Sequence, residues 1–402
     1  MASNKVVLGF SGGLDTSYCV KYLHEDLGYE VHSITVNTGG FTAAELKQVE
    51  DHAYALGVKS HTTVNAVKTY YDSIIKYLVF GNVLKNNTYP LSVSAERLSQ
   101  ALHIADHVKA VNAQAVAHGS TGAGNDQVRF DMVFNIMIPG IAILTPIRDL
   151  KLSREEEIAY LKAKGVDMNF SKSMYSINKG LWGTSVGGKE TLSSKGMLPE
   201  EAWPTQLTNT GSEEVKLGFV KGELKTINGK SFHHASEAIQ YLQTIAGAYA
   251  IGRDIHVGDT IIGIKGRVGF EAAAPMVILK AHHALEKHVL TKWQLSWKDQ
   301  LAQFYGNWLH EGQILDPVMR DIESYLETSQ RNVTGEVFVQ LHPYRFTITG
   351  IESPFDLMNS KFGKYGEMNN GWTGEDVRGF TKIFGNQTMI YHQVKEQSNV
   401  KI

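Results

Sequence analysis

Two hydrophobic periods alternate along the first 164 residues of the chain. Short apolar or alternating runs predict strands, and apolar residues that recur every three or four positions predict helices. The predicted strands are residues 5–10, 30–36, 61–64, 115–117 and 141–144. The predicted helices are a run that begins at Tyr18 and residues 43–56, 67–80, 92–109 and 153–164. Because strands and helices alternate, we predict a parallel, doubly wound α/β sheet.

The pattern changes after residue 168. An Asn228-Gly229 pair between alternating segments predicts a hairpin within residues 214–232. Further predicted helices are residues 236–245, 276–290 and 294–326, and further predicted strands are residues 333–341 and 344–349. We therefore expect an α/β domain over residues 1–168, an α+β domain over residues 169–358, and a C-terminal helix region over residues 359–402.

The last predicted helix, residues 375–395, is amphipathic. Its apolar positions are Val377, Phe380, Ile383, Phe384 and Ile390. A helix with such a face is stable in water only when a partner surface covers it. This segment is therefore a predicted interaction element.

The sequence Ser11-Gly-Gly-Leu-Asp-Thr-Ser17 joins the first predicted strand to the first predicted helix. Paired glycines let backbone N–H groups approach an anion, and the hydroxyl groups of Ser11, Thr16 and Ser17 lie where a helix N-terminus points, so the stretch predicts a phosphate site. It lacks the lysine of G-x-x-x-x-G-K-S/T and the pattern G-x-G-x-x-G, which excludes both of those nucleotide loops. An ordinary Gly-Gly turn is the alternative.

A second polar, glycine-rich stretch, residues 118–130, follows the predicted strand 115–117. Its glycines free the backbone to wrap a ligand, and its polar side chains include those of Thr121, Asn125, Asp126 and Arg129. Ligands of parallel sheets bind beyond the carboxyl ends of the strands, where both stretches lie. We predict recognition of a small zwitterion, and a surface loop followed by an Asn/Asp helix cap fits the same residues.

Composition limits the class of partner. A formal net charge of -2 gives no basic excess for a polyanion, so we expect no nucleic-acid partner. The single cysteine, Cys19, excludes an intrachain disulfide and a thiolate metal cage. The start of the chain has no signal-like apolar region and no apolar run approaches 18 residues, so we expect no membrane contact and a cytoplasmic protein.

A cluster of histidines, His282, His283 and His288, raises the question of a metal site. We identified no carboxylate or cysteine at ligand spacing around it. The pattern therefore favours a solvated or interface helix face over a metal site.

The stretch Ser11–Ser17 resembles the pyrophosphate loop of the ATP pyrophosphatase superfamily, which cleaves ATP between its α and β phosphates. Together with residues 117–130, which read A-H-G-S-T-G-A-G-N-D-Q-V-R-F, it resembles the argininosuccinate synthase family. Further similar segments, within about residues 5–350, are Tyr89 to Arg97, Tyr175-Ser176 with Ser185, and Lys265 to Glu271.

This resemblance implies that citrulline and aspartate are joined to give argininosuccinate, AMP and pyrophosphate through a citrullyl-adenylate. ATP is then a substrate, and Mg²⁺ is carried on its phosphates with few protein ligands and no assigned metal site on the chain. The resemblance also implies a homotetramer in which the C-terminal helix reaches another subunit. The first domain is then the ATP-binding domain, and the second carries the synthetase and multimerisation functions.

The resemblance assigns residues to each substrate. Those for ATP are Gly9, Phe10, Ser11, Gly12, Gly13, Leu14, Asp15, Thr16, Ser17, Val36 and Gly119. Those for aspartate are Thr121, Asn125 and Asp126, and those for citrulline are Tyr89, Ser94, Asn125, Arg129, Ser176, Ser185, Asp259 and Phe270. Ser11, Asp15 and Asp126 are assigned to catalysis, and Asp15 either orients the loop or meets the metal.

Two other classes of function were weighed. Other adenylating members of the superfamily, which modify tRNA or use glutamine, need a basic surface, a persulfide cysteine or a glutaminase domain, and the sequence shows none of these. A nucleotide-binding module without catalysis is disfavoured because the phosphate loop keeps every hydroxyl group.

The chain departs from the family pattern at several polar positions. Ala123 replaces a lysine, residues 37–40 replace I-G-Q, and Asn178 stands where an aspartate is expected. Gly258 and Phe270 replace a glutamate and a tyrosine that similar enzymes use around citrulline. Either Asp259 replaces that glutamate as the partner of the α-ammonium group, or the substrate is an N-acylated citrulline for which Gly258 leaves room.

Overall fold

The computed structural model describes residues 4–166, 175–359, 361, 363, 365–367 and 371–397. The chain forms two compact units, Met1–Phe355 and Asp356–Ile402. The predicted boundary at residue 168 lies outside the described residues. Within the described part of the chain, none of the helices has the length and apolar character needed to cross a membrane.

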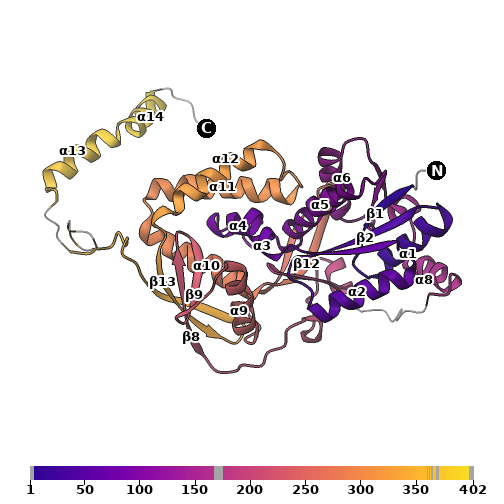
Figure 1. The fold of residues 1–402 in the computed structure, drawn as a ribbon. Helices are drawn as coiled ribbons and strands as arrows, with labels where there is room; N and C mark the ends of the chain where they lie inside the picture. Colours follow the sequence, from indigo (N-terminus) through magenta and orange to yellow (C-terminus); the bar gives the residue numbers. More distant parts are fainter. Residues whose placement is uncertain are drawn as a thin grey trace. The chain divides into compact units, whose positions relative to one another are not determined.

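A parallel five-stranded sheet forms the first part of the larger unit (Figure 1). In chain order its strands are β1 (Lys5–Gly9), β2 (Glu30–Asn37), β3 (Ser60–Asn65), β4 (Ala115–Ala117) and β5 (Ala142–Leu144). Their order in the sheet is β3-β2-β1-β4-β5 with parallel pairing throughout, which confirms the predicted strands and sheet type. The strand order reverses between β1 and β4, and ligands of open parallel sheets bind at such a point.

Helices cover both faces of this sheet. Against the face of Val6 and Leu8 lie α1 (Leu14–Lys21) with a π-helical turn (Tyr22–Asp26), α2 (Ala43–Leu56) and α8 (Arg154–Ala163). On the other face lie α5 (Ser92–Val111) and α6 (Asp126–Met137). The connecting helices are α3 (Val67–Tyr70), a π-helical turn (Tyr71–Ile75), α4 (Lys76–Phe80) and α7 (Pro146–Asp149).

The helix boundaries follow local chemistry. Thr42 and Glu45 form a capping box at the start of α2, and Gly57 ends it at φ +100°, as predicted. The first helix begins at Leu14 and not at Tyr18, because Gly13 is extended and the polar residues after it already form the first turn. Apolar periodicity could not detect that turn.

Two antiparallel sheets form the rest of the larger unit. One has the order β10-β9-β8-β13-β14, from β8 (Glu213–Val220), β9 (Glu223–Ile227), β10 (Lys230–Ser231), β13 (Gly335–His342) and β14 (Arg345–Glu352). The other has the order β11-β12-β7-β6, from β6 (Ser176–Gly180), β7 (Gly183–Gly187), β11 (Arg253–Asp259) and β12 (Lys265–Glu271). The Asn228-Gly229 hairpin is confirmed between β9 and β10, whereas the strands of the second sheet were not predicted.

The helices of this part are α9 (Ala235–Gly247), α10 (Ala273–Val289), α11 (Lys292–His310) and α12 (Pro317–Ser329), with single 3-10 turns at Lys189–Leu192, Glu200–Ala202 and Gln330–Asn332. The prediction of one helical segment over residues 294–326 is wrong. Gly312 adopts φ +86° and Pro317 begins a new helix, so the chain turns between α11 and α12.

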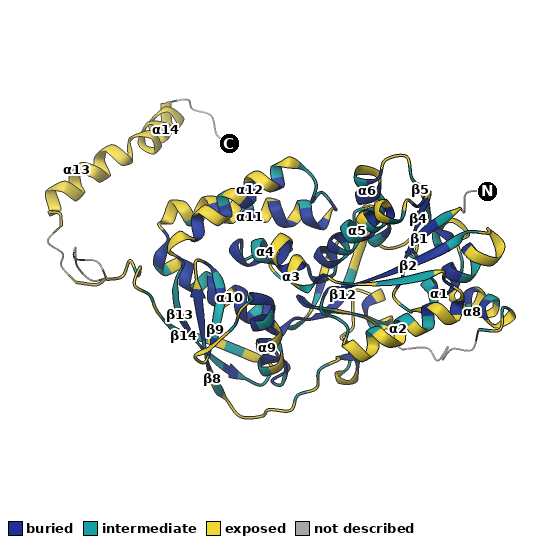
Figure 2. Cartoon of the chain, viewed as in Figure 1, coloured by how far each residue is buried: buried dark blue, intermediate teal, exposed yellow. Residues whose placement is uncertain are grey.

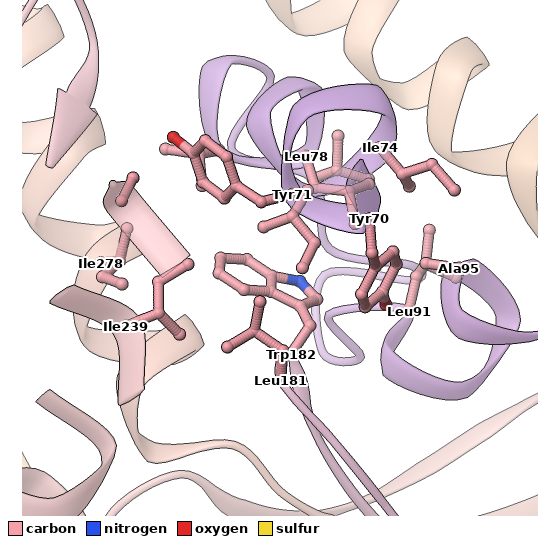
Figure 3. Packing of buried hydrophobic residues seen from close by; sticks show 14 of the residues in the cluster. Tyr70, Tyr71, Ile74, Leu78, Leu91, Ala95, Leu181, Trp182, Ile239 and Ile278 are labelled. Atoms are coloured by element: carbon pink, nitrogen blue, oxygen red, sulfur yellow. The ribbon is translucent and has the colours of Figure 1, made fainter. Parts of the chain in front are cut away.

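One apolar core runs through both parts of the larger unit. Trp182, which is 1% exposed, comes from the hairpin of β6 and β7 and packs among helices of both parts. Figure 3 shows its indole between Tyr71 and Leu78 on one side and Ile239 and Ile278 on the other. Its Nε1–H donates to the carbonyl oxygen of Pro90 at 2.9 Å, so the buried polar atom is paired.

The smaller unit holds α13 (Gly374–Phe384) and α14 (Asn386–Gln397). The single helix predicted over residues 375–395 is therefore interrupted at Gly385. Both helices are exposed along their described length, as Figure 2 shows. The rings of Phe380 and Phe384 stack on the exposed surface with centroids 5.1 Å apart.

Candidate active site

The phosphate loop follows β1 at the point where the strand order of the sheet reverses. Gly12 adopts φ +77°, a conformation that favours glycine. The hydroxyl groups of Ser11 and Thr16 lie 3.3 Å apart, and Thr16 Oγ1 donates to the carbonyl oxygen of Gly13 at 3.2 Å. Among the described residues no side chain caps the N-terminus of α1, so its first N–H groups remain available to an anion.

The other residues predicted to bind ATP surround this loop. Ser17 is buried, and its hydroxyl bonds the carbonyl oxygen of Gly13 at 2.7 Å and His52 Nε2 at 2.9 Å. The carbonyl oxygen of Phe10 accepts from Thr35 Oγ1 at 2.7 Å, and Val36 follows in the neighbouring strand. A Cβ on Gly119 would lie 3.3 Å from the Asp15 backbone, which places the second loop directly against the first.

Side-chain hydrogen bonds support the second loop, which lies within residues 118–130. His118 Nε2 lies 2.9 Å from Asp131 Oδ1, and Arg148 Nη1 donates to Asp131 Oδ2 at 2.6 Å. Gln127 Nε2 donates to the carbonyl oxygens of Gly122 and Gly124. The loop between these supports leaves Thr121 exposed and Asn125 half-buried.

A network of paired charges begins where this loop enters α6, with Arg129 buried and Arg97 and Asp126 half-buried. Asp126 accepts from Arg97 Nε and from Arg129 Nη1, each at 3.0 Å. Arg129 also donates to Ser94 Oγ at 2.9 Å and to the carbonyl oxygen of His310. Three of the predicted site residues, Ser94, Asp126 and Arg129, are thus in direct contact.

The protonation states of this network follow from burial and charge. Burial alone would raise the pKa of Asp126, but Arg97 and Arg129 outweigh it and lower that pKa, so the carboxylate is ionised. Burial, and then the charge of Arg129, lower the pKa of His310 to about 4. At neutral pH His310 is therefore an uncharged imidazole, hydrogen-bonded to Ser94 Oγ at 3.2 Å.

The four-stranded sheet presents one polar face to this network. Its register pairs Phe270 with Ser185 and Ser185 with Asn178, so these side chains share one face. Asn178 Oδ1 accepts from Arg97 Nη2 at 2.8 Å, which ties the sheet to the network. Tyr89, from the turn before α5, contacts this face through the Phe270 ring at 5.4 Å.

His256 lies on the same face, opposite Val268 and two residues before Gly258. Its imidazole stacks on the Tyr89 ring with centroids 5.2 Å apart, and burial lowers its pKa. A Cβ on residue 258 would collide with His256 Nε2. The imidazole of His256 therefore lies next to Gly258, and the room that Gly258 leaves for an acyl group stays a prediction.

The structure does not bring every predicted citrulline residue to this face. Strand alternation turns Asp259 away from the face of Gly258, and its carboxylate pairs with Lys265 Nζ at 2.6 Å on the surface. Only the carbonyl oxygen of Asp259 reaches the network, 3.3 Å from His310 Nε2. Ser176 is exposed on β6, and Asn125 Oδ1 accepts from the N–H of Ile261 at 2.9 Å.

Sequence reasoning missed Arg97, His256 and His310 as parts of the site. Arg97 had a signal, because it ends the family-like segment that begins at Tyr89. His310 had none, because it lies 181 residues from its partner Arg129. His256 could be found only from the strand register that places it beside Gly258.

The expectation of a solvated or interface helix face is wrong for His282, whereas His283 and His288 are half-buried. His282 is completely buried in the core, and burial lowers its pKa. Its Nδ1–H donates to Asn82 Oδ1 at 2.7 Å, and the same nitrogen lies 3.8 Å from Oε2 of Glu286, a carboxylate that the sequence analysis did not identify. Among the described residues, no group of His, Cys, Asp and Glu side chains is arranged to hold a metal ion.

Comparison with known proteins identifies the architecture. Residues 5–167 match the family model "Arginosuccinate synthase N-terminal HUP domain", and residues 175–391 match "Arginosuccinate synthase C-terminal domain". An argininosuccinate synthase of Methanocaldococcus jannaschii is 36% identical over 394 residues, covering 97% of this chain and 98% of the relative. One of Xanthomonas campestris is 36% identical over 408 residues, covering 98% and 100%. The chain belongs to the argininosuccinate synthase family.

Proposed function

We propose that the protein joins citrulline and aspartate to form argininosuccinate, with ATP cleaved to AMP and pyrophosphate. Two neighbouring features carry this proposal. One is the glycine loop without a lysine, which ends at the N-terminus of α1, and the other is the charged Arg97–Asp126–Arg129 network. The first suits a departing pyrophosphate, and the second suits the charged groups of amino acids.

The first chemical step is attack by the ureido oxygen of citrulline on the α-phosphorus of ATP. The bond to the bridging oxygen breaks, and pyrophosphate leaves with the electron pair, giving a citrullyl-adenylate. The N–H groups of the phosphate loop and the N-terminus of α1 stabilise the charge on pyrophosphate. Mg²⁺ enters on the ATP phosphates as part of this substrate.

In the second step the aspartate amine attacks the activated ureido carbon, AMP leaves, and the amine loses a proton. Asn125, Asp126 and Thr121 are proposed to hold aspartate, and Arg129, Ser94 and Ser185 to hold citrulline. Asp126 also accepts hydrogen bonds from Arg97 and Arg129, so one carboxylate orients both guanidinium groups. Catalysis then depends mainly on position and charge.

The nature of the products tests the proposal. Incubation with labelled ATP, citrulline and aspartate should give AMP and pyrophosphate in equal amounts, because the loop lacks the lysine that γ-phosphate transferases use. ADP and phosphate as main products would exclude this reaction, as would AMP formation that does not depend on citrulline.

A second candidate substrate is an N-acylated citrulline, because the resemblance places the α-nitrogen near Gly258, where similar enzymes have a glutamate. If the α-nitrogen of citrulline lies at this place, as the resemblance implies, it lies beside the uncharged imidazole of His256. Asp259 is engaged with Lys265 on the opposite side of the strand. An ammonium group without a carboxylate partner loses a charged hydrogen bond that contributes about 1.5–3 kcal/mol of binding free energy. An uncharged amide nitrogen loses less binding free energy at the same place.

Comparison of kcat/KM for citrulline, N-acetylcitrulline and N-succinylcitrulline decides between the substrates. A strong preference for citrulline ends the acyl candidate. An Asp259→Ala variant provides the matched control. Loss of citrulline use in that variant would mean that the Asp259 carboxylate turns toward the site and pairs with the α-ammonium group.

We also propose that the exposed apolar face of α13 contributes to a homotetramer. Val377, Phe380 and Ile383 are exposed on that helix, and such faces are usually covered by a partner. Removal of residues 374–402 should lower the oligomeric state seen by light scattering. An intact assembly after the truncation would contradict this assignment.

A further inference from the structure

Strand β11 lies at one edge of the four-stranded sheet, so one side of its main chain has no neighbouring strand in that sheet. The N–H of Thr260 donates to the carbonyl oxygen of Ile264 at 2.8 Å, across the hairpin that β11 forms with β12. Main-chain groups alternate along a strand between its two sides, so residues 257, 259 and 261 direct theirs to the free edge. These groups are the ones that an edge strand leaves open to a partner.

Side chains from three other segments hold this edge at every second residue. The bonds are from Asn86 Nδ2–H to the carbonyl oxygen of Val257 at 3.2 Å, from His310 Nε2–H to the carbonyl oxygen of Asp259 at 3.3 Å, and from the N–H of Ile261 to Asn125 Oδ1 at 2.9 Å. Asn86 is exposed in the segment between α4 and α5, whereas His310, at the end of α11, is only 7% exposed. Side chains therefore take the place that a further strand would have.

His310 joins this edge to the network of paired charges through hydrogen bonds of fixed direction. A carbonyl oxygen only accepts, so Nε2 carries the proton that is donated to Asp259. Arg129 Nη2 only donates and lies 3.4 Å from Nδ1 of His310, so Nδ1 is the unprotonated nitrogen. Ser94 Oγ accepts from Arg129 Nη2 at 2.9 Å and donates its own O–H to the same Nδ1 at 3.2 Å. One imidazole thus connects Arg129 and Ser94 to the main chain of β11.

The face that β11 presents to the site depends on where this edge lies. His256 and Gly258 alternate along β11 with the residues of the free edge, and the His256 ring stacks on Tyr89 with centroids 5.2 Å apart. Among the described residues no hydrogen-bond partner reaches His256 Nδ1, although this atom is enclosed. The imidazole is therefore placed by the strand and by the Tyr89 ring. A shift of Asp259 at the edge passes through Gly258 to His256.

We propose that His310 is a positioning residue for the amino-acid site: it fixes the edge of β11 to Ser94 and Arg129, and so sets where the His256 imidazole lies relative to these two side chains. This inference rests on the proposed function, which assigns Ser94 and Arg129 to citrulline. His310 touches no reacting atom and acts through β11. Loss of its Nε2–H releases the edge at Asp259, moves His256 and impairs the use of citrulline, whereas the phosphate loop keeps its conformation.

Steady-state kinetics test the proposal, with citrulline or with the N-acyl form if the wild type uses that form better. His310→Ala removes the bond to Asp259, so kcat/KM for this substrate should fall about tenfold while KM for ATP changes less than about twofold. His310→Gln can place an amide N–H where the Nε2–H lies, so it should recover most of the loss. Asn86→Gly is the matched control, because it removes a bond to the same edge outside the network, and glycine suits the φ of +51° there. The control should keep the wild-type kinetics.

A double-mutant cycle tests whether the effect passes through β11. His256→Leu removes the imidazole that His310 is proposed to place. Addition of His310→Ala to this variant should therefore cause less than about a twofold further loss of kcat/KM, although the same change costs about tenfold in the wild type. Losses that multiply would mean that His310 does not act through His256.

Hydrogen exchange of the amides in residues 253–264 gives a readout that needs no turnover. His310→Ala should speed this exchange by about threefold or more, and His310→Gln should leave it near the wild-type rate. Unchanged exchange or unchanged kcat/KM in His310→Ala, an equal loss of kcat/KM in Asn86→Gly, or multiplying losses in the cycle overturns the proposal. Absence of AMP and pyrophosphate formation by the wild type overturns the proposed function, and this inference with it.

Discussion

The phosphate loop and the amino-acid cradle, which comprises Ser94, Arg97, Asp126, Arg129 and His310, are built in opposite ways. The phosphate loop takes its polar groups from seven consecutive residues, Ser11–Ser17, and mostly from backbone N–H and hydroxyl groups. The cradle takes charged side chains from α5 and α6, and adds the neutral His310 at the end of α11 and a face of the four-stranded sheet. The loop is therefore set by local conformation, and the cradle by tertiary packing.

This difference predicts which substitutions unfold the protein and which only impair ligand binding. A change in the cradle leaves a buried charge without its partner. This lowers the free energy of unfolding, because a buried charge is stable only when it is paired. A change in the loop alters backbone conformation near solvent. Stability should therefore separate the two regions more sharply than activity.

The largest effect is expected for Asp126→Ala, which removes the anion shared by Arg97 and Arg129. Leaving Arg129 buried without it should lower the free energy of unfolding by about 3–5 kcal/mol. The transition-state free energy for reaction of aspartate should rise by about 1.5–3 kcal/mol, because a charged hydrogen bond is lost. The binding of ATP should change less. Chemical denaturation and separate KM values for aspartate and ATP measure this. Asp259→Ala, which breaks only a surface pair, is the control and should keep wild-type stability.

An intermediate effect is expected from His310 when pH is lowered. Its pKa is about 4 in the folded protein and near 6.5 when unfolded, so the unfolded chain binds the extra proton between these values. Stability should fall by about 3 kcal/mol as pH drops from 6.5 to 4. His310→Asn should remove this part of the pH dependence, whereas the exposed His24→Asn should not. Equal profiles for all three proteins would contradict a buried, neutral His310.

The smallest effect on stability is expected in the loop, for Gly12→Ala. Alanine at φ +77° should cost about 1–2 kcal/mol of stability and lower kcat/KM for ATP about 10- to 100-fold by shifting the loop. Gly28→Ala is the matched control, since Gly28 adopts φ +70° with no neighbour in the way. The control should show the same loss of stability with normal use of ATP. Equal activity in both variants would mean that the loop conformation does not matter.

The same contrast explains what the sequence could predict. The parallel sheet, its strands and the position of the phosphate loop follow from periodicity and from glycine and hydroxyl spacing, which are local properties. The β6–β7 and β11–β12 hairpins were missed, because Ser176–Gly187 and Arg253–Glu271 carry many glycines and polar residues and their apolar alternation is weak. Without their register, neither the position of His256 beside Gly258 nor the outward direction of Asp259 could be derived.

Trp182 has a consequence for how substrates enter. Its side chain packs between helices of both parts of the larger unit. A hinge motion that separated these parts would expose 150–250 Å² of indole surface, roughly 4–6 kcal/mol at ~25 cal/mol per Å². Opening and closing by domain rotation is therefore disfavoured. We expect substrates and products to enter and leave through local movement of two turns, one around Gly122 in the second loop and one around Gly263 between β11 and β12. Such movements have the timescale of loops and not of domains.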